Sequence, residues 1–345
     1  MNARDSISRS RAAWAWTAGL IALAVVAPFF VYPVFVMKAL CMALFACAFN
    51  LLIGYVGLLS FGHAAFFGGA SYITAHTAKV WGLPPELAIL AGVATAAALG
   101  TAVGFLAIRR QGIYFAMITL AFAQMVFFFC LQAKFTGGED GIQAVPRGHL
   151  FGFIDLNNSL VMYYFVLAVF LFGFGVIART IYSPFGQVMK AIRENEPRAV
   201  SLGYRADHYK LLAFILSAAL AGLAGSTKAL VFQFASLTDV NWTMSGEVVL
   251  MTLLGGIGTI LGPVVGAFVI TTMENYLAQT GSWVTVIEGV IFVICVLTFR
   301  SGIVGVLSPY VMGRRSREGL PPEEIEIEEE EPAPRKLAEP ASQTR

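Results

Sequence analysis

The sequence predicts an all-α polytopic membrane protein with about 8–10 transmembrane helices and both termini in the cytoplasm. Apolar residues make up 57% of the 345 residues and charged residues only 13%, whereas soluble domains carry about 25% charged residues. The mean hydropathy is +0.73. Apolar stretches of about 20 residues, enough to cross roughly 30 Å of hydrocarbon, recur along the chain. Lys and Arg gather in alternate connecting segments.

The first apolar stretch covers residues 14–37 and follows a polar segment, 1–13, that is predicted to be cytoplasmic. It is longer than the roughly 7–15 residues of a signal-peptide core, so we expect a span. Two prolines, Pro28 and Pro33, are expected to bend it. Further spans are expected at about 39–59, 61–78, 87–108, 112–133, 160–178, 211–235 and 283–299.

Charge placement predicts the orientation, because Lys and Arg are enriched in short cytoplasmic loops. With the N-terminus inside, the outside loops contain only Lys38, Lys79, Lys134 and Arg147. The basic residues of the inside loops are Arg109, Arg110, Arg179, Lys190, Arg193, Arg198, Arg205, Lys210, Arg300, Arg314, Arg315 and Arg317.

A glycine-rich stretch interrupts the apolar segment 245–275. A single span there would place the C-terminal arginines outside, whereas two short segments return them to the cytoplasm. We therefore expect a broken hairpin, either re-entrant or crossing as two short spans. Broken helices often lie beside transport paths. The candidate path-lining or helix-packing residues of this hairpin are Gly255, Gly256, Gly258, Gly262 and Pro263.

Residues 14–305 thus form one predicted transmembrane domain with two long connections. These are an outside, periplasmic loop at 134–159 and an inside loop at 179–210. The tail 314–345 holds 9 acidic and 6 basic residues with several prolines. It is predicted to be an acidic, disordered cytoplasmic tail.

The sequence contains no recognisable nucleotide, metal or catalytic motif. The stretch 225–228, Gly-Ser-Thr-Lys, has P-loop residues in the wrong order within an apolar run. The cysteines also lie in apolar runs without ligand spacing and are expected to be buried small hydrophobic residues. They are Cys41, Cys47, Cys130 and Cys295. No catalytic residue, cofactor or metal is expected in this chain.

The longest inside loop contains a segment, 182–204, that mixes both signs of charge with helix-forming residues and ends near a glycine. One interpretation is a short helix on the membrane face that docks into a partner protein. The other is a solvated connector with surface ion pairs. The residues alone leave both interpretations open.

At this segment the chain resembles the LivM-type permeases of high-affinity branched-chain amino-acid ABC importers. The resemblance runs over about residues 38–305. Its motifs are NLLIGYVG (50–57), LSFGHAAFFG (59–68), GIYFAMITLAF (112–122), TGG (136–138), AIRE through Gly203 (191–203), KLLAF (210–214) and LGGIG through GP (254–263).

The resemblance implies a non-enzymatic permease subunit in the bacterial inner membrane that carries branched-chain amino acids, or a related solute such as urea or an amide. ATP-Mg would be hydrolysed in partner subunits. The implied partners are a second homologous permease subunit forming a heterodimer, two cytosolic ABC ATPase subunits, a periplasmic solute-binding protein and the lipid bilayer, with no nucleic acid.

The resemblance also assigns ATPase coupling to the 191–203 segment. The implied coupling residues are Ala191, Arg193, Glu194, Glu196, Ala199, Leu202 and Gly203. The general importer motif places Glu-Ala-Ala six residues before its glycine. Here Pro and Arg follow Glu196, and Gly203 comes seven positions later, so the role rests on the LivM-type likeness and the loop position.

Polar residues at membrane depth usually face the bundle interior or water. His63 lies in one of the family motifs and is a candidate for lining the path or packing helices, with a hydrogen-bonded structural histidine as the alternative. Lys228 either extends toward the outer face or has a functional role. The other candidate path-lining or helix-packing residues are Asn50, Gly57, Gly62 and Thr119.

Two other function classes are the alternatives to a permease subunit. An ion-coupled secondary transporter is the alternative, although such proteins would be expected to carry paired carboxylates within their spans. A membrane-embedded enzyme would need a His/Asp/Glu cluster at the membrane edge, and the sequence suggests none.

Overall fold

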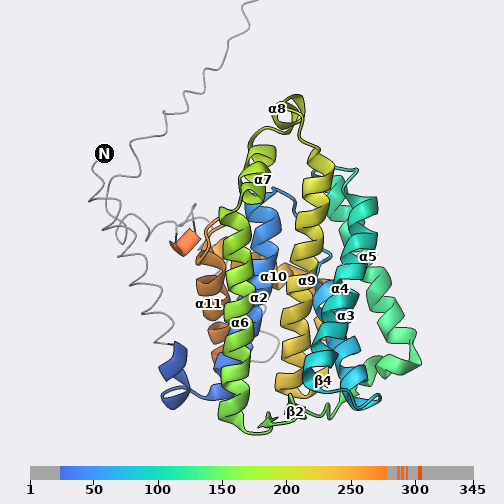
Figure 1. The fold of residues 1–345 in the computed structure, drawn as a ribbon, viewed down its shortest axis with the longest axis vertical. Coiled ribbons are helices and arrows are strands. Elements are labelled where there is room, and N and C mark those ends of the chain that lie inside the picture. The colour runs from blue at the N-terminus through green and yellow to red at the C-terminus, as the bar shows by residue number, and fades with distance from the viewer. Residues whose placement is uncertain (1–23, 278–285, 288, 291–292, 294–301, 305–345) are drawn as a thin grey trace, which may run out of the picture. The chain divides into compact units, whose positions relative to one another are not determined.

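The structure of the protein, a computed structural model, describes residues 24–277, 286–287, 289–290, 293 and 302–304. Its helices run roughly along one direction and pack side by side (Figure 1). They are α2 (Pro33–Tyr55), α3 (His63–Lys79), α4 (Pro85–Ala107), α5 (Ile113–Gln132), α6 (Ser159–Tyr182), α7 (Pro184–Glu194), α8 (Glu196–Ser201), α9 (Ala206–Phe232), α10 (Trp242–Gly255) and α11 (Gly262–Leu277).

Five of these helices, α2, α4, α5, α6 and α9, are long and apolar enough to cross a membrane. This confirms the predicted all-α polytopic fold class. The apolar windows of α2 and α9 are 89% and 72% buried, whereas those of α4, α5 and α6 are 28–39% buried. Thus α2 and α9 form the centre of the bundle and the other three form its outer wall.

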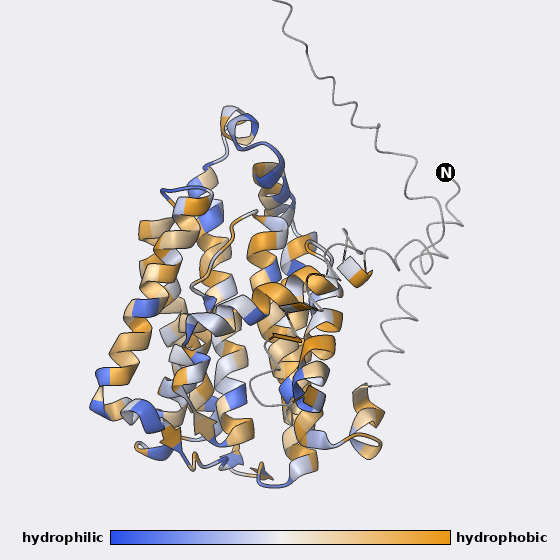
Figure 2. Ribbon diagram, turned by 180° about the vertical axis from the view of Figure 1, so that it is seen from behind, coloured by the Kyte–Doolittle hydropathy of each residue, from blue (hydrophilic) through white to orange (hydrophobic). Residues whose placement is uncertain are grey.

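The outer wall exposes large apolar side chains along the helices, and the ribbon in Figure 2 shows hydrophobic residues prevailing along the helices and more hydrophilic residues toward the ends. Exposed apolar side chains of this kind suit contact with lipid. Examples on α4, α5 and α6 are Phe105, Leu106, Met117, Met125, Phe128, Phe129 and Phe172.

Small residues let α3, α4 and α9 approach closely. A Cβ added at Gly225 of α9 would lie 2.0 Å from the carbonyl oxygen of Phe67 in α3. One added at Gly222 would lie 2.3 Å from the Cβ of Ala96 in α4. Close backbone approach through small residues is a common mode of helix packing in membranes. It seats the short α3 beside the two longer helices.

The beginning of the described chain differs from the expected first span. Residues Ala27–Phe29 form a 3-10 turn, η1, and α2 begins at Pro33. Pro33 occupies the first turn of α2, where a missing N–H costs no helical hydrogen bond. It therefore starts a helix rather than bending one, and residues 34–37 belong to the second expected span.

The expected break in 245–275 is confirmed. Helices α10 and α11 are separated by residues 256–261, in which Gly256 and Gly258 have φ values of 118° and 76°. We call this segment the glycine turn. At 1.5 Å per residue α10 is about 21 Å long, shorter than a hydrocarbon core of about 30 Å. Helix α11 is described over about 24 Å, up to the last residue before the gap at 278–285.

Two contacts with α2 give the direction in which this hairpin runs. The glycine turn meets the C-terminal end of α2, because the amide of Gly258 donates to Asn50 Oδ1. Near the beginning of α2, Lys38 Nζ is 2.8 Å from Glu274 Oε2 of α11. The hairpin therefore runs along α2 with its turn toward the end that carries α7 and α8, which we call the α8 end (top of Figure 1).

The opposite end, which we call the strand end, holds the expected 134–159 loop. This loop contains the 3-10 turns η2 (Lys134–Thr136) and η3 (Gly138–Asp140) and the strands β1 (Ile142–Gln143), β2 (His149–Leu150) and β3 (Ile154–Asp155). Strand β1 pairs antiparallel with β4 (Phe234–Ala235), next to η4 (Leu237–Asp239), and β2 pairs antiparallel with β3.

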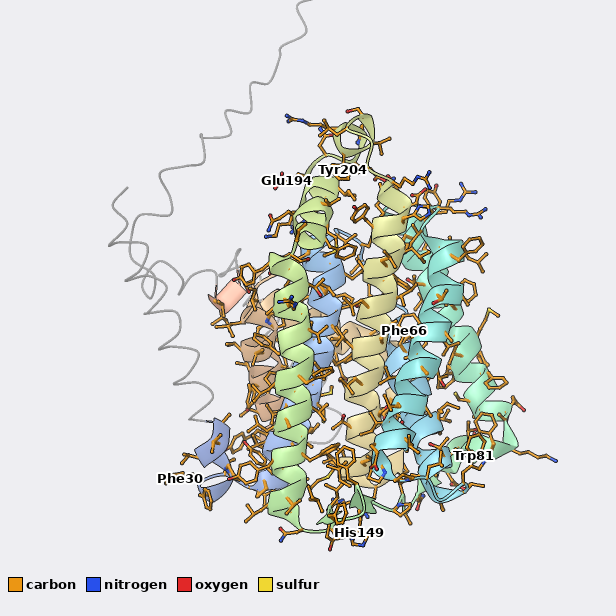
Figure 3. All side chains as sticks on the ribbon, in the orientation of Figure 1. Phe30, Phe66, Trp81, His149, Glu194 and Tyr204 are labelled. Atoms are coloured by element: carbon orange, nitrogen blue, oxygen red, sulfur yellow. The ribbon has the colours of Figure 1, made fainter. Side chains whose placement is uncertain are left out.

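Arg147 closes the strand end over α9, because its guanidinium donates to the carbonyl oxygens of Leu230 and Val231. Those carbonyls lie in the last turn of α9, where cations are favourable. Burial lowers the pKa of Arg147. Figure 3 shows Phe30, Trp81 and His149 near this end and Glu194 and Tyr204 at the α8 end.

Several expectations lie outside the described residues: the segment 1–13, the first span up to residue 23, most of the span at 283–299, Cys295 and the tail 314–345.

Candidate functional site

The α8 end carries the segment that the sequence singled out for coupling. It forms two short helices, because Asn195 interrupts it, whereas the sequence left a single short helix and a solvated connector both open. Ser183 caps α7 by accepting from the amide of Gly186, and Asn195 caps α8 by accepting from the amide of Arg198. A proline in the first turn of each helix fixes where that helix begins.

The two helices are held to α9 by a small apolar cluster of Ile192, Ala199 and Ala206, with Val188 and Tyr209 against it. Of the predicted coupling residues, Ala199 is therefore buried inside the segment. Leu202, by contrast, is 70% exposed. Ala191, Arg193, Glu194 and Gly203 are also exposed.

Glu196 ties the segment to two other elements. Its carboxylate accepts from Lys210 Nζ of α9 at 2.6 Å and from Gln111 Nε2, between α4 and α5, at 2.8 Å. The Lys210 side chain is only 4% exposed. Charge-assisted bonds of this length are among the stronger side-chain interactions. Glu196 thus positions α8 against the bundle.

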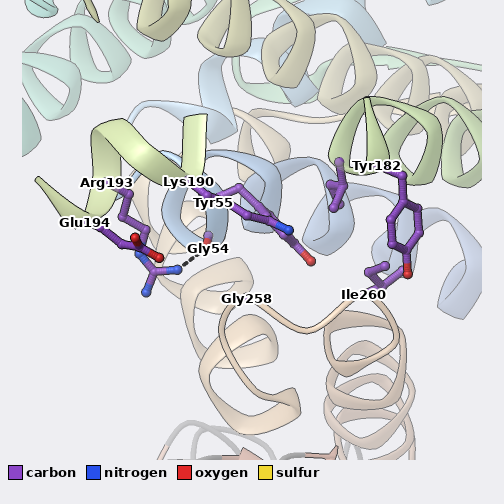
Figure 4. Close-up of a pocket in the computed structure, with 9 residues that line it drawn as sticks. Gly54, Tyr55, Tyr182, Lys190, Arg193, Glu194, Gly258 and Ile260 are labelled. Carbon is purple, nitrogen blue, oxygen red and sulfur yellow. Dashed lines mark hydrogen bonds between the residues drawn. The ribbon is translucent and has the colours of Figure 1, made fainter. Parts of the chain in front are cut away.

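Arg193 links α7 to the centre of the bundle. Its guanidinium donates to the carbonyl oxygen of Gly54, near the C-terminal end of α2 (Figure 4). A Cβ added at Gly57 would lie 3.1 Å from Arg193 Cγ, and one added at Gly258 would lie 3.4 Å from its Nη1. One side chain of α7 therefore contacts both α2 and the glycine turn.

Asn50 holds the glycine turn from the α2 side. Its Nδ2 donates to the carbonyl oxygen of Thr259 at 2.8 Å, and its Oδ1 accepts from the amide of Gly258 at 2.9 Å. Asn50 is 2% exposed. It satisfies two backbone groups that helix hydrogen bonding leaves free at the break.

The remaining predicted residues of the hairpin bring the two ends of the glycine turn close together. A Cβ added at Gly255 would lie 1.9 Å from the carbonyl oxygen of Gly262, and Thr259 Oγ1 donates to the carbonyl oxygen of Gly256. Pro263 lies in the first turn of α11 and is buried. These contacts hold the end of α10 close to the start of α11.

Three predicted residues gather at the start of α3. His63 Nε2 lies 2.9 Å from Ser217 Oγ of α9, whose hydroxyl donates to the carbonyl oxygen of Ala48. The amide of Phe61 donates to Thr119 Oγ1 at 3.2 Å. A Cβ added at Gly62 would lie 2.9 Å from the carbonyl oxygen of Thr119.

His63 is fully buried, with the rings of Phe49, Phe66 and Phe214 placed edgewise around it. It joins α3 to α9 in an aromatic core. The structure thus separates the predicted residues into an α8-end group around Arg193 and Asn50 and a core group around His63.

A cavity of about 580 Å³ opens at the α8 end. It is lined by Gly54, Tyr55, Ile181, Tyr182, Lys190, Arg193, Glu194, Gly258 and Ile260 (Figure 4). Its walls come from α2, α6, α7 and the glycine turn. It therefore lies where the coupling segment meets the broken hairpin.

Sequence reasoning missed the ion pairs of Lys228 and Lys38. Lys228 pairs with Asp239, which is 1% exposed, and its Nζ lies 5.5 Å from the ring centroid of Phe67. Lys38 and Glu274 form the other pair. A lone lysine in an apolar span is a signal for a nearby acid, but the partners are 11 and 236 positions away.

The described residues contain no cluster of three or more His, Cys, Asp or Glu side chains that could hold a metal ion. Within that same part of the chain, Cys41, Cys47 and Cys130 are free and buried.

Comparison with known proteins identifies the family. A family model described as "Branched-chain amino acid transport system / permease component" matches residues 34–297. The chain is 28% identical over 284 residues to the high-affinity branched-chain amino acid transport system permease protein LivM of Salmonella typhimurium, covering 75% of this chain and 67% of that protein.

Two other relatives are permeases named for the same cargo and for a different one. The BraD permease of the Pseudomonas aeruginosa branched-chain amino acid system is 25% identical, covering 76% of this chain and 91% of that protein. The ribose import permease RbsC of Bacillus subtilis is 28% identical, covering 48% of this chain and 51% of its own. No solved structure matches. Because the family model covers most of the chain, this multi-pass membrane protein belongs to the branched-chain amino-acid transport permeases of ABC transporters.

Proposed function

We propose that the protein is the permease subunit of an ATP-driven importer that moves branched-chain amino acids across the bacterial inner membrane. The observation that carries the proposal is the contact of Arg193 with Gly54 beside the glycine turn. It joins an exposed helical segment to a broken hairpin in the bundle. This arrangement suits a subunit that receives movement at its surface and transmits it to a path.

In this proposal the α8 end faces the cytoplasm and the strand end faces the periplasm. Two cytosolic ATPase subunits contact the α7–α8 segment, a second homologous permease completes the path, and a periplasmic binding protein delivers the solute. ATP binding at the ATPases supplies the free energy that favours one state of the permease pair over the other. Movement of α7 would then shift the glycine turn and α2 together.

A related small solute, such as urea or an amide, is the alternative cargo, because specificity in this arrangement depends largely on the separate binding protein. An ion-coupled secondary transporter is the alternative class. The carboxylates of Asp239 and Glu274 are each engaged by a lysine, which favours a structural role for both over cation coupling.

Solute-stimulated ATPase activity tests the proposal. The chain is co-expressed with the permease, ATPase and binding-protein genes beside its own, and the complex is reconstituted into proteoliposomes. Binding protein loaded with leucine, urea or an aromatic amino acid is then added. We expect leucine to stimulate ATP hydrolysis only in complexes that contain this chain. Solute movement by the chain alone on an ion gradient, without ATP, would instead support a secondary transporter.

The coupling assignment has its own test. Replacing both Glu194 and Glu196 with Lys should remove stimulation by loaded binding protein. Unchanged stimulated ATPase activity in the double variant would remove these residues from the coupling role.

A further inference from the structure

The cavity at the α8 end has the size of a small-molecule site. Its volume of about 580 Å³ falls within the roughly 300–1,000 Å³ typical of ligand pockets. It opens at the same end as the exposed α7–α8 segment. It is therefore distinct from the aromatic core around His63, where the polar groups bond to one another.

The charged side chains of the cavity still have charges and hydrogen-bonding groups available to a ligand. Lys190 Nζ lies 5.6 Å from the ring centroid of Tyr55. Within the described part of the chain, neither Lys190 nor Glu194 forms a salt bridge within 4.0 Å. Arg193 bonds to the carbonyl of Gly54 through one nitrogen, and a guanidinium has five N–H donors.

The rest of the lining is apolar or aromatic: Ile181, Ile260, Tyr55 and Tyr182. Figure 4 shows Arg193 and Glu194 toward one side of the cavity and Tyr182 and Ile260 toward the other, with Lys190 and Tyr55 between them. The cavity thus combines cations for a carboxylate, a carboxylate for an ammonium group and an apolar wall.

We infer that this cavity binds a small zwitterionic amino acid with an apolar side chain, entering from the α8 end. Lys190 and Arg193 bind its carboxylate, Glu194 binds its ammonium group, and Ile181 and Ile260 contact its side chain. That this ligand is also the transported solute rests on the proposed function. The site would then hold the solute on the side where import releases it.

A bound ligand would act on the coupling segment. The cavity is formed jointly by α7 and the glycine turn, so an occupant that contacts both favours the state in which they lie together. Accumulated solute at the α8 end should therefore slow further transport. Binding and the state of α7 would be coupled reciprocally.

Direct binding tests the site. The assembled complex, in nanodiscs without binding protein or nucleotide, is titrated with radiolabelled L-leucine. We expect saturable binding that Lys190→Met weakens roughly tenfold or more, because a charge-assisted hydrogen bond is lost. Lys190→Arg keeps the charge and should retain binding. Unlabelled leucinol, which lacks the carboxylate, and 4-methylpentanoate, which lacks the ammonium group, should compete poorly.

Arg179→Met is the matched control, because Arg179 is exposed at the same end of α6 but does not line the cavity. It should bind leucine as the wild type does. Absence of saturable binding to the wild type, or equal binding by Lys190→Met, would overturn the inference. Recovery of intact complex for each variant on size-exclusion chromatography excludes loss through misfolding.

A transport arm separates this inference from the proposed function. Uptake from leucine-loaded binding protein is measured in proteoliposomes with or without leucine inside. Absence of uptake in both cases, with leucine still bound at the cavity, contradicts the proposed cargo but supports the site. Uptake that internal leucine slows in the wild type and in Arg179→Met, but not in Lys190→Met, supports both. Uptake that internal leucine leaves unchanged contradicts the proposed effect of the site.

Discussion

Asn50 is the side chain on which the glycine turn most directly depends. It is buried in α2 and makes one donor and one acceptor bond to backbone groups of the turn, at Thr259 and Gly258. In a membrane no water is available to replace such bonds in the bundle interior. A helix residue more than 200 positions away therefore fixes the conformation of the break.

We expect Asn50→Ala to destabilise the protein by about 1–3 kcal/mol for each backbone group left unsatisfied. Thermal unfolding of the complex in detergent, followed by intrinsic fluorescence, checks this. Asn157→Ala, at an exposed asparagine of the strand end whose partner is Asp155, should change stability little. A melting temperature of Asn50→Ala equal to that of the wild type would show that the turn does not depend on these bonds.

The ion pair of Lys228 and Asp239 is the other residue-scale feature with a large expected effect. Removing one member of a buried pair leaves an uncompensated charge and costs about 3–5 kcal/mol. Lys228→Met should therefore destabilise the protein strongly, and the double variant Lys228→Met with Asp239→Leu should recover much of the loss. Lys79→Met, at an exposed lysine that donates to the carbonyl oxygen of Gln143, is the control in the same melting assay.

At the scale of elements, the contact between α2 and the hairpin depends on the absence of a side chain at Gly54. A Cβ there would lie 2.4 Å from Asn50 Oδ1 and 2.8 Å from the amide nitrogen of Gly258. Neither atom can retreat without breaking the bond between them. The glycine turn thus packs against Gly54, the only glycine of α2.

Gly54→Ala should therefore separate the turn from α2, lower the stability of the complex by at least 1 kcal/mol and reduce uptake. Gly175→Ala offers a matched control, because nothing lies within 4 Å of a Cβ added at that position of α6. There the better helix propensity of Ala should raise stability by up to about 1 kcal/mol. The melting temperature and the leucine uptake of both variants test whether the turn depends on this close contact. Equal behaviour of the two variants would contradict the proposed seating.

The same elements show what sequence could and could not predict. Apolar length and charge placement located α4, α5, α6 and α9 and required a break in 245–275. They placed the boundary before α2 wrongly, because a proline can either bend a helix or begin one. The strands of the 134–159 loop were not expected, since β1 is two residues long and its partner lies about 90 positions away.

The candidate residues were less predictable than the fold. Sequence grouped Asn50 with His63 because both are polar residues of apolar spans, yet one holds the glycine turn and the other lies in the aromatic core. Likewise Ala199 and Leu202 were both assigned to coupling, and only Leu202 is exposed. Which face of a short helix packs depends on its tertiary partners, here Ile192 and Ala206.

At the scale of the whole molecule, the bundle separates a fixed part from a part suited to movement. The packed centre of α2 and α9 is joined to α7 and α8 by the polar contacts of Arg193 and Glu196 and by apolar contacts, namely buried Met189 in the main core and the cluster of Ile192, Ala199 and Ala206. The α7–α8 segment is charged, largely exposed and made of two short helices. Movement applied at α8 would therefore reach α2 and the hairpin before it disturbed the aromatic core.

Leu202 provides the cleanest test of docking at this scale. Glu196→Lys would set a cation against Lys210 and disturb the bundle itself, so its effect on coupling has two causes. Leu202 is 70% exposed beyond α8, and an apolar side chain so placed suits the core of a protein interface.

Leu202→Glu should therefore leave the melting temperature of the isolated subunit within about 2 °C of the wild type. It should abolish most of the ATPase activity stimulated by loaded binding protein. Leu202→Met, which keeps the apolar contact, should preserve that activity. Full stimulation in Leu202→Glu would place the ATPase contact elsewhere on the α8 end.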